Sequence, residues 1–217
     1  MKIHPRIALA CFAAAAVLTG CATPPSQADL DRIAADVVKS SFRGQGIATL
    51  DRLVQDDSNR ECSAAEVAGV VLAVARAKAI EAANLKTVKW PGDGKFLGDW
   101  KEGERIAQSG RGLTWTDDGK TPNGGNCYNC HQMSKEEISF GSLGPSLYNY
   151  GKLRGVVDAN SPVSRPIVEY TWGKVWNAKA YNACSNMPRA GHAGILSEEQ
   201  MRHIVALLLD PQSPVNK

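Results

Sequence analysis

Apolar residues recur every three or four positions in several stretches of the chain, and this spacing predicts helices. In the first half, the pattern runs from Ala28 to Phe42 and again, more briefly, from Ile47 to Val54. Ser63-Ala64-Ala65-Glu66 has the arrangement of a capping box, in which a serine and a glutamate satisfy backbone amides at the start of a helix. We therefore expect an alanine- and valine-rich helix from Ser63 to about Leu85.

The second half of the chain carries three further helical patterns and one shorter pattern. Asp99–Arg111 begins at a potential N-cap, and residues 167–176 have helical spacing. Ser197 opens a second capping box, and the helix that follows ends at Leu209, shortly before a proline. Residues 146–153 are expected to form a short helix. No alternating run is long enough to require a sheet, so the predicted fold is all-α.

A cluster of helix-breaking residues divides these patterns into two groups. Trp90-Pro91-Gly92-Asp93-Gly94 interrupts the helical spacing and marks the predicted domain boundary. Residues 22–95 are then a proline-containing tether with a helical N-terminal extension, and residues 96–217 are a separate domain.

The second domain contains the motif with the clearest chemistry. Cys127-Tyr128-Asn129-Cys130-His131 has the C-x-x-C-H spacing at which a c-type haem is attached. Cys127 and Cys130 can each form a thioether to the same porphyrin, and His131 then lies under the iron as its proximal ligand. A C-x-x-C pair can also bind zinc or act as a redox dithiol. The adjacent histidine and the lack of a second such pair argue against zinc, and the redox dithiol stays open.

The sixth iron position decides between electron transfer and catalysis. Met187, followed by a proline, stands in a loop before the last predicted helix. A thioether ligand there raises the iron potential and closes the position to substrates, which favours electron transfer. His192 is the alternative ligand and would give a bis-histidine iron. Met133 is too close to the haem motif to reach the opposite face, and Met201 is in register for the core.

A proximal histidine also needs a partner for its other ring nitrogen. Gly144-Pro145-Ser146-Leu147 makes a tight turn shortly after the haem motif. The carbonyl of Pro145 is the candidate acceptor for the proton on the non-ligating nitrogen of His131, which would fix the tautomer and the plane of the ring. The alternative interpretation is a turn with no such role.

The N-terminus indicates export from the cytoplasm. Lys2 and Arg6 precede an apolar run over residues 7–18, which is too short to span a bilayer comfortably. Leu18-Thr19-Gly20-Cys21 resembles the lipobox of bacterial lipoproteins, so residues 1–21 are interpreted as a lipoprotein-type signal with Cys21 as the lipidation site. Ordinary cleavage after Ala22 is the alternative. Both predict a periplasmic protein, and lipidation would hold it at the membrane.

The remaining cysteines suggest a disulfide. The chain has six cysteines. With Cys11 in the signal, Cys21 as the lipid site and two in the haem motif, Cys62 and Cys184 are left as a pair in an oxidising compartment. Their bond would tie the extension to the loop that carries Met187. Two free thiols or a link to a partner chain are the alternatives.

Composition and charge exclude few classes of function. The chain is 43% hydrophobic and 22% charged, as in ordinary globular proteins, and its net charge of +3 gives no reason to propose nucleic acid as a partner. Basic residues outnumber acidic ones between positions 150 and 190, which suggests either a ring that orients an acidic partner or a solvated face. The basic residues are Lys152, Arg154, Arg165, Lys174, Lys179 and Arg189.

Four segments of the chain carry a family resemblance over about residues 97–217. They are Gly125–His131 around the haem motif, Gly144–Leu147, Met187-Pro188-Arg189-Ala190-Gly191, and the C-terminal ending Ala206–Asn216. With these segments the domain resembles SoxX, the monohaem cytochrome c subunit of the SoxAX complex of bacterial thiosulfate oxidation. Residues 24–95 and the lipobox depart from the compact, freely soluble form of that family.

The resemblance implies a class I cytochrome c-like domain with one covalently attached haem c. Cys127 and Cys130 would be the thioether sites, His131 the proximal ligand and Met187 the distal ligand. In the family, a SoxA-like partner carries the catalytic cysteine, which couples thiosulfate to a cysteine of the SoxYZ carrier protein. The SoxX haem passes the released electrons to a small acceptor cytochrome, so the chain would be the electron-transfer subunit of an L-cysteine S-thiosulfotransferase complex with no catalytic residue of its own.

Two other functions remain compatible with the same residues. One is a general membrane-tethered monohaem cytochrome c that carries electrons to an oxidase. The other is a haem enzyme or gas-binding protein in which the sixth iron position is open.

Overall fold

The computed structural model describes residues 24–137 and 140–217, so the predicted signal and Cys21 lie outside the described residues. Within these ranges there are no strands, only an isolated bridge between Gln45 and Ala48, and the predicted all-α class is confirmed. The α-helices are α2 (Gln27–Ser41), α3 (Asp57–Val67), α4 (Val74–Leu85), α5 (Trp100–Gln108), α6 (Arg165–Trp176) and α7 (Glu198–Leu209). The 3-10 helices are η1 (Leu50–Leu53), η2 (Cys127–Asn129), η3 (Lys152–Arg154), η4 (Pro162–Ser164) and η5 (Ala178–Ala180).

The chain divides into two compact units, Met1–Arg43 and Gly44–Lys217. The described part of the first unit consists mainly of α2, which confirms the helix predicted over 28–42. Ser26 caps α2 through a capping box with Asp29, and no side chain of the helix is buried. In the second unit, residues 44–95 belong to the same compact body as residues 96–217. The boundary near residue 95 stays a prediction.

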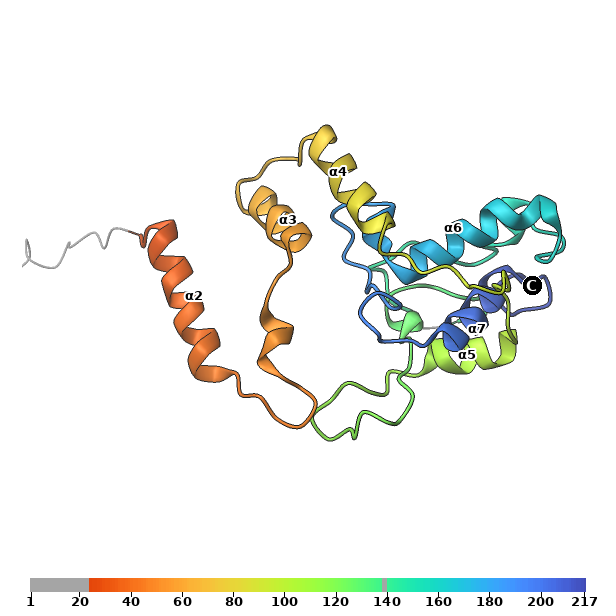
Figure 1. Ribbon diagram of the computed structural model, residues 1–217, viewed down its shortest axis with the longest axis horizontal. Coiled ribbons are helices and arrows are strands. Elements are labelled where there is room, and N and C mark those ends of the chain that lie inside the picture. The colour runs from red at the N-terminus through yellow and green to blue at the C-terminus, as the bar shows by residue number, and fades with distance from the viewer. Residues whose placement is uncertain (1–23, 138–139) are drawn as a thin grey trace, which may run out of the picture. The chain divides into compact units, whose positions relative to one another are not determined.

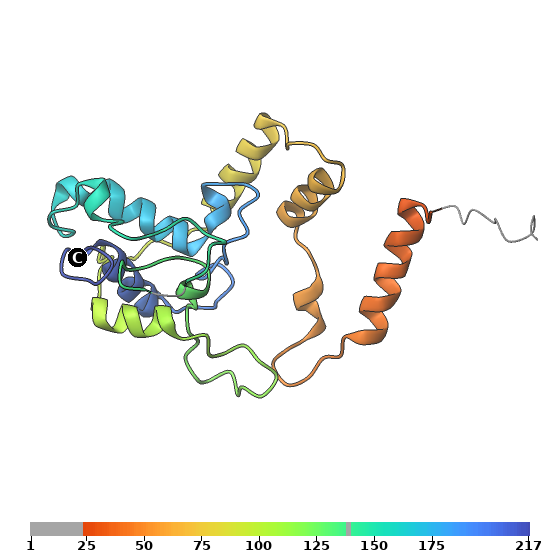
Figure 2. The ribbon, with the colours of Figure 1, turned by 180° about the vertical axis from the view of Figure 1, so that it is seen from behind.

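The second unit is built around α7, which lies between α5 and α6 in both views (Figures 1 and 2). Asp99 and Ser197 cap α5 and α7 as predicted. Where α5 and α7 meet, an added Cβ on Gly103 would lie 2.1 Å from the carbonyl oxygen of His203, so this close approach requires glycine. His203 also accepts a hydrogen bond from the backbone N–H of Asp99 at its Nδ1, 2.8 Å away, which joins the two helices again.

The hydrophobic core of this unit extends from α5, α6 and α7 to the chain that follows α4. The indole rings of Trp172 and Trp176 stack with their centroids 6.0 Å apart. Their N–H groups donate to the backbone carbonyls of Lys89 and Thr87, at 2.9 and 3.2 Å. Because one short backbone segment satisfies both donors, residues 87–89 are fixed along α6, and Val88 between the two carbonyls is part of the core.

Two of the predicted helices are wrong. The expected helix from Ser63 to Leu85 is two helices, α3 and α4, and Ser63 lies inside α3. The cap belongs to Asp56, whose side chain accepts from the Asn59 amide, and α3 ends before Gly69, which has a left-handed φ of 64°. The short helix expected over residues 146–153 is limited to η3, which begins at Lys152, because Asn149 takes a left-handed φ of 58° and its amide bonds to the Val215 carbonyl.

No helix within the described ranges has both the length and the apolar character needed to cross a bilayer.

Candidate functional site

The C-x-x-C-H motif begins beside the C-terminal end of α5. The backbone amides of Gly125 and Asn126 donate to the carbonyls of Ile106 and Ser109, at 2.8 and 2.9 Å. The last carbonyls of a helix have no partner inside it, so these two bonds satisfy them and fix the start of the motif. Asn126 takes a left-handed φ of 52°, which turns the chain into the one-turn helix η2 that carries Cys127.

The two motif cysteines are free and partly buried. Cys130 and His131 both donate their backbone amides to the Cys127 carbonyl, at 3.1 and 2.9 Å, which holds the three residues in one tight turn. Burial raises the pKa of the Cys127 thiol to about 11. A redox dithiol depends on a lowered thiol pKa, so this environment is unsuited to that alternative.

The residues near these two thiols also do not favour a zinc site. In residues 24–137 and 140–217, no group of three or more His, Cys, Asp or Glu side chains is close enough to hold a metal ion. A structural zinc site in proteins needs four such ligands.

His131 is oriented for coordination through one ring nitrogen. Its side chain is buried, and its Nδ1 lies 2.7 Å from the carbonyl oxygen of Pro145, the acceptor expected from the sequence. With Nδ1–H donating there, Nε2 is left with the lone pair that a metal ligand requires. The turn that carries Pro145 is itself held to the motif, because Gly144 donates its amide to the Cys130 carbonyl at 2.8 Å.

Gly144 lies directly against the imidazole, and replacing it tests this arrangement. In Gly144→Ala, the added Cβ would lie 2.2 Å from Cε1 of His131, and the ring cannot move away without losing the Pro145 bond. We expect a loss of stability of about 1–3 kcal/mol and reduced haem content, measured by thermal unfolding and absorbance. Gly92→Ala is the matched control, because its Cβ meets no atom within 4 Å. Equal haem content and stability in both variants would contradict the close approach.

Met187 is better placed to be the distal iron ligand than the other candidate side chains. It is half-buried and packs against the same hydrophobic core as Cys127, Tyr128 and Leu147. His192, the alternative ligand, is exposed. The other two methionines of the second domain, Met133 and Met201, are fully buried in the core, and this burial was expected for Met201.

These residues together fit a covalently attached haem. The motif supplies two thiols within one turn, an imidazole with its second nitrogen already bonded, and a backbone approach that only glycine allows. Met187 adds a thioether beside the same core. This donor set is that of a haem with histidine and methionine axial ligands.

The loop before Met187 carries the predicted disulfide. Cys62 on α3 and Cys184 are bonded, with their Cα atoms 5.5 Å apart. Cys184 is exposed and Cys62 is partly buried. The bond therefore joins the N-terminal extension to the Met187 loop, as expected from the count of cysteines.

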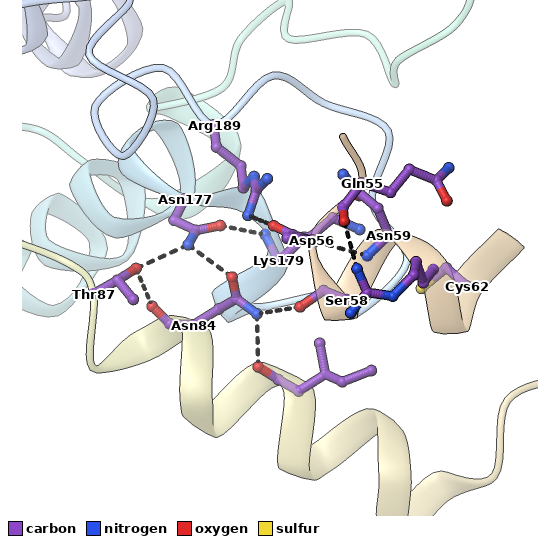
Figure 3. Close-up of polar contacts among 12 residues, drawn as sticks. Gln55, Asp56, Ser58, Asn59, Cys62, Asn84, Thr87, Asn177, Lys179 and Arg189 are labelled. Carbon is purple, nitrogen blue, oxygen red and sulfur yellow. Dashed lines mark hydrogen bonds and ion pairs between the residues drawn. The ribbon is translucent and has the colours of Figure 1, made fainter. Parts of the chain in front are cut away.

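An ion pair on the other side of Met187 was not predicted from the sequence. Arg189 Nη1 lies 2.6 Å from Oδ2 of Asp56, the N-cap of α3 (Figure 3). Burial alone raises the pKa of Asp56, but the Asn59 amide and the Arg189 guanidinium outweigh it and hold the pKa below its usual range. Asp56 is recognisable from the sequence as a potential N-cap, whereas nothing local indicates Arg189 as its partner.

Contacts within the protein bear on the ring of basic residues, which was one of two interpretations of positions 150–190. Lys179 is buried and donates to the Ala183 carbonyl at 3.0 Å, and burial lowers its pKa. Arg189 is paired with Asp56, and Arg165 with Glu169 at 2.6 Å. Lys179 and Arg189 are thereby held against protein groups, whereas Arg165 is exposed and its surface pair with Glu169 leaves it on the solvated face.

Comparisons with known proteins agree with this site. The family model for cytochrome c matches residues 116–210, a range that includes the C-x-x-C-H motif and Met187. The chain is also 37% identical over 134 residues to an uncharacterized lipoprotein of Aquifex aeolicus (strain VF5). That alignment covers 60% of this chain and 59% of the relative, so the chain spans about three fifths of the relative's length.

Proposed function

We propose that this c-type cytochrome, whose residues 116–210 form a cytochrome c domain, is the electron-transfer subunit of a SoxAX-like complex that processes thiosulfate. One observation supports electron transfer most strongly. An imidazole fixed in orientation and a methionine lie beside the same hydrophobic core. His131 is held through Nδ1 by Pro145, and Met187 packs beside Cys127. The assignment to thiosulfate is supported by the resemblance of the motif, the Met187–Gly191 loop and the C-terminal ending to SoxX.

Each residue of the site has a defined task in this function. Cys127 and Cys130 would hold the haem through thioethers, and His131 and Met187 would supply the side chains that bind its iron. When bound, the haem supplies one-electron chemistry. Pro145 keeps the proton of His131 on Nδ1, and Met187 would exclude water and substrates from the iron. No residue of this chain is assigned as a nucleophile, so bond making to thiosulfate belongs to the partner.

The partners follow from that division of work. A SoxA-like cytochrome subunit would bind this chain as a heterodimer and carry the catalytic cysteine. The SoxYZ carrier protein and a small acceptor cytochrome c would bind transiently. The lipoprotein relative supports export to the periplasm, with Cys21 as a lipid anchor to the membrane.

Reduction by thiosulfate in a defined mixture tests the proposal. The mature holoprotein is mixed with a SoxA-like cytochrome, its carrier protein and thiosulfate, and the haem spectrum of this chain is followed. We expect a stable heterodimer and haem reduction that requires all three additions. A mixture without the carrier protein is the control.

The absence of both the heterodimer and the thiosulfate-dependent reduction would contradict the proposal. If the haem nevertheless exchanged electrons rapidly with an oxidase, the chain would be the general membrane-tethered shuttle, a function that the lipoprotein relative also fits.

A further inference from the structure

We propose that α3, with its cap Asp56, is a clamp that positions the distal ligand loop and keeps Met187 on the iron. The clamp consists of two attachments between α3 and the loop, the Cys62–Cys184 disulfide and the Asp56–Arg189 ion pair. Asp56 and Cys62 are positioning residues, since they act through the loop. The inference rests on the proposed function only in that Met187 is the distal ligand.

The two attachments lie on either side of Met187. Cys184 precedes the methionine and Arg189 follows it, and both are bound to the same helix. The Arg189 side chain is 19% exposed and the Asp56 side chain 41% exposed, so the guanidinium half of this ion pair is the part shielded from solvent. A loop fixed to one rigid element at both ends has few ways to swing its central residue away from the core.

The helix that provides the attachments is itself fixed to the rest of the unit. Ser58 on α3 accepts a hydrogen bond from Nδ2 of Asn84 at 3.1 Å, and Oδ1 of Asn84 accepts from Asn177 at 2.9 Å. Asn177 is completely buried after α6 and also donates to Thr87 at 3.0 Å (Figure 3). Buried amides of this kind are costly to separate, and α3, which has no buried side chain of its own, is tied to them through Ser58.

The loop needs such support because its own bonds are few. Ser185 donates its amide to the Asn182 carbonyl at 3.0 Å, and Met187 donates to Oγ of Ser185 at 3.3 Å. Pro188 has no amide hydrogen to donate. Asn182, Cys184 and Pro188 are exposed. Segments with few buried contacts open at low free energy, and a thioether held in such a segment is easily displaced by an external ligand.

The Asp56→Asn variant of the holoprotein tests the ion pair without removing the cap. Asparagine caps helices as well as aspartate does, so α3 is kept while the charge facing Arg189 is lost. We expect the apparent affinity of ferric haem for added imidazole to rise about threefold, because the open loop becomes more populated. Hydrogen exchange in residues 182–190 should also become faster. Glu61→Gln is the matched control, because it breaks an ion pair of the same helix with Arg76, which lies on α4 and not on the loop.

The disulfide is tested by the double variant Cys62→Ser with Cys184→Ser, which leaves the haem cysteines in place. We expect imidazole affinity to rise about tenfold and the weak near-red absorption band of methionine–iron ligation to lose intensity. Adding Asp56→Asn to this double variant should raise the imidazole affinity further. Arg189→Lys keeps the positive charge, so it should reduce the intensity of this band less than Arg189→Gln does.

Two results would contradict different parts of the account. A wild-type protein that lacks the methionine–iron band would remove Met187 as a ligand, and with it both the clamp and the electron-transfer site. A wild-type protein that has the band, while Asp56→Asn and the disulfide variant match Glu61→Gln in imidazole affinity and loop exchange, would overturn the clamp alone. Lower thermal stability without those two changes would mean that α3 is only structural.

Discussion

Replacing Cys127 and Cys130 together with serine will give a colourless protein, even in a host that attaches c-type haem efficiently. Serine cannot form the thioethers, and the remaining ligands are not enough to retain a porphyrin during maturation. Absorbance in the haem region and the mass of the intact protein measure the result. The Cys62→Ser, Cys184→Ser double variant is the matched control, because it replaces the same number of cysteines and should stay coloured.

The outcome separates the haem site from its alternatives. If the Cys127/Cys130 variant kept its full colour and its added mass, the C-x-x-C-H motif would not be the attachment site. If wild-type protein from the same host were itself colourless, the haem assignment as a whole would be wrong, and the partly buried thiols would need another explanation.

Replacing Met187 with alanine will leave the protein coloured but change the iron. Loss of the thioether removes the near-red band, opens the sixth position to carbon monoxide in the reduced protein, and lowers the reduction potential by on the order of 0.1–0.3 V. Absorbance, carbon monoxide titration and redox titration measure these changes. The haem content should be close to wild type, because both thioethers and His131 are unchanged.

His192→Ala is the matched control for that experiment. His192 is exposed, so its loss should alter neither the band nor the potential. If His192→Ala produced the changes and Met187→Ala did not, the iron would have two histidine ligands and a lower potential than proposed. If neither variant changed carbon monoxide binding and the wild type bound it readily, the chain would be a haem enzyme or gas-binding protein.

Features encoded in a few neighbouring residues could be predicted from the sequence. The capping box at Ser197 and the N-cap at Asp99 set the starts of α7 and α5, and both appear in the structure. The acceptor carbonyl of Pro145 also follows from a short stretch of chain. The capping-box pattern at Ser63 failed because such patterns are common inside helices, and Asp56 already supplies the cap.

Features that depend on distant residues were predicted only where chemistry limited the partners. Cysteines pair with cysteines, so counting them indicated the Cys62–Cys184 bond, with free thiols or a link to a partner chain as the alternatives that the structure decides against. Any aspartate or glutamate is a possible partner for Arg189, and only the fold brings Asp56 to it. Counting charges also failed to show that Lys179 is buried, since burial is a property of packing.

The Cys62–Cys184 bond has a consequence for how the protein is assembled. Its two cysteines are 122 residues apart, and Cys127 and Cys130 lie inside the segment that the bond encloses. All four cysteines are therefore exposed to the same oxidants after export. Thiol–disulfide exchange could then join a haem-motif cysteine to Cys62 or Cys184. The order of covalent steps is thus constrained. Thioether formation needs Cys127 and Cys130 as free thiols, so any disulfide that involves either of them has to be prevented or reduced before haem is attached.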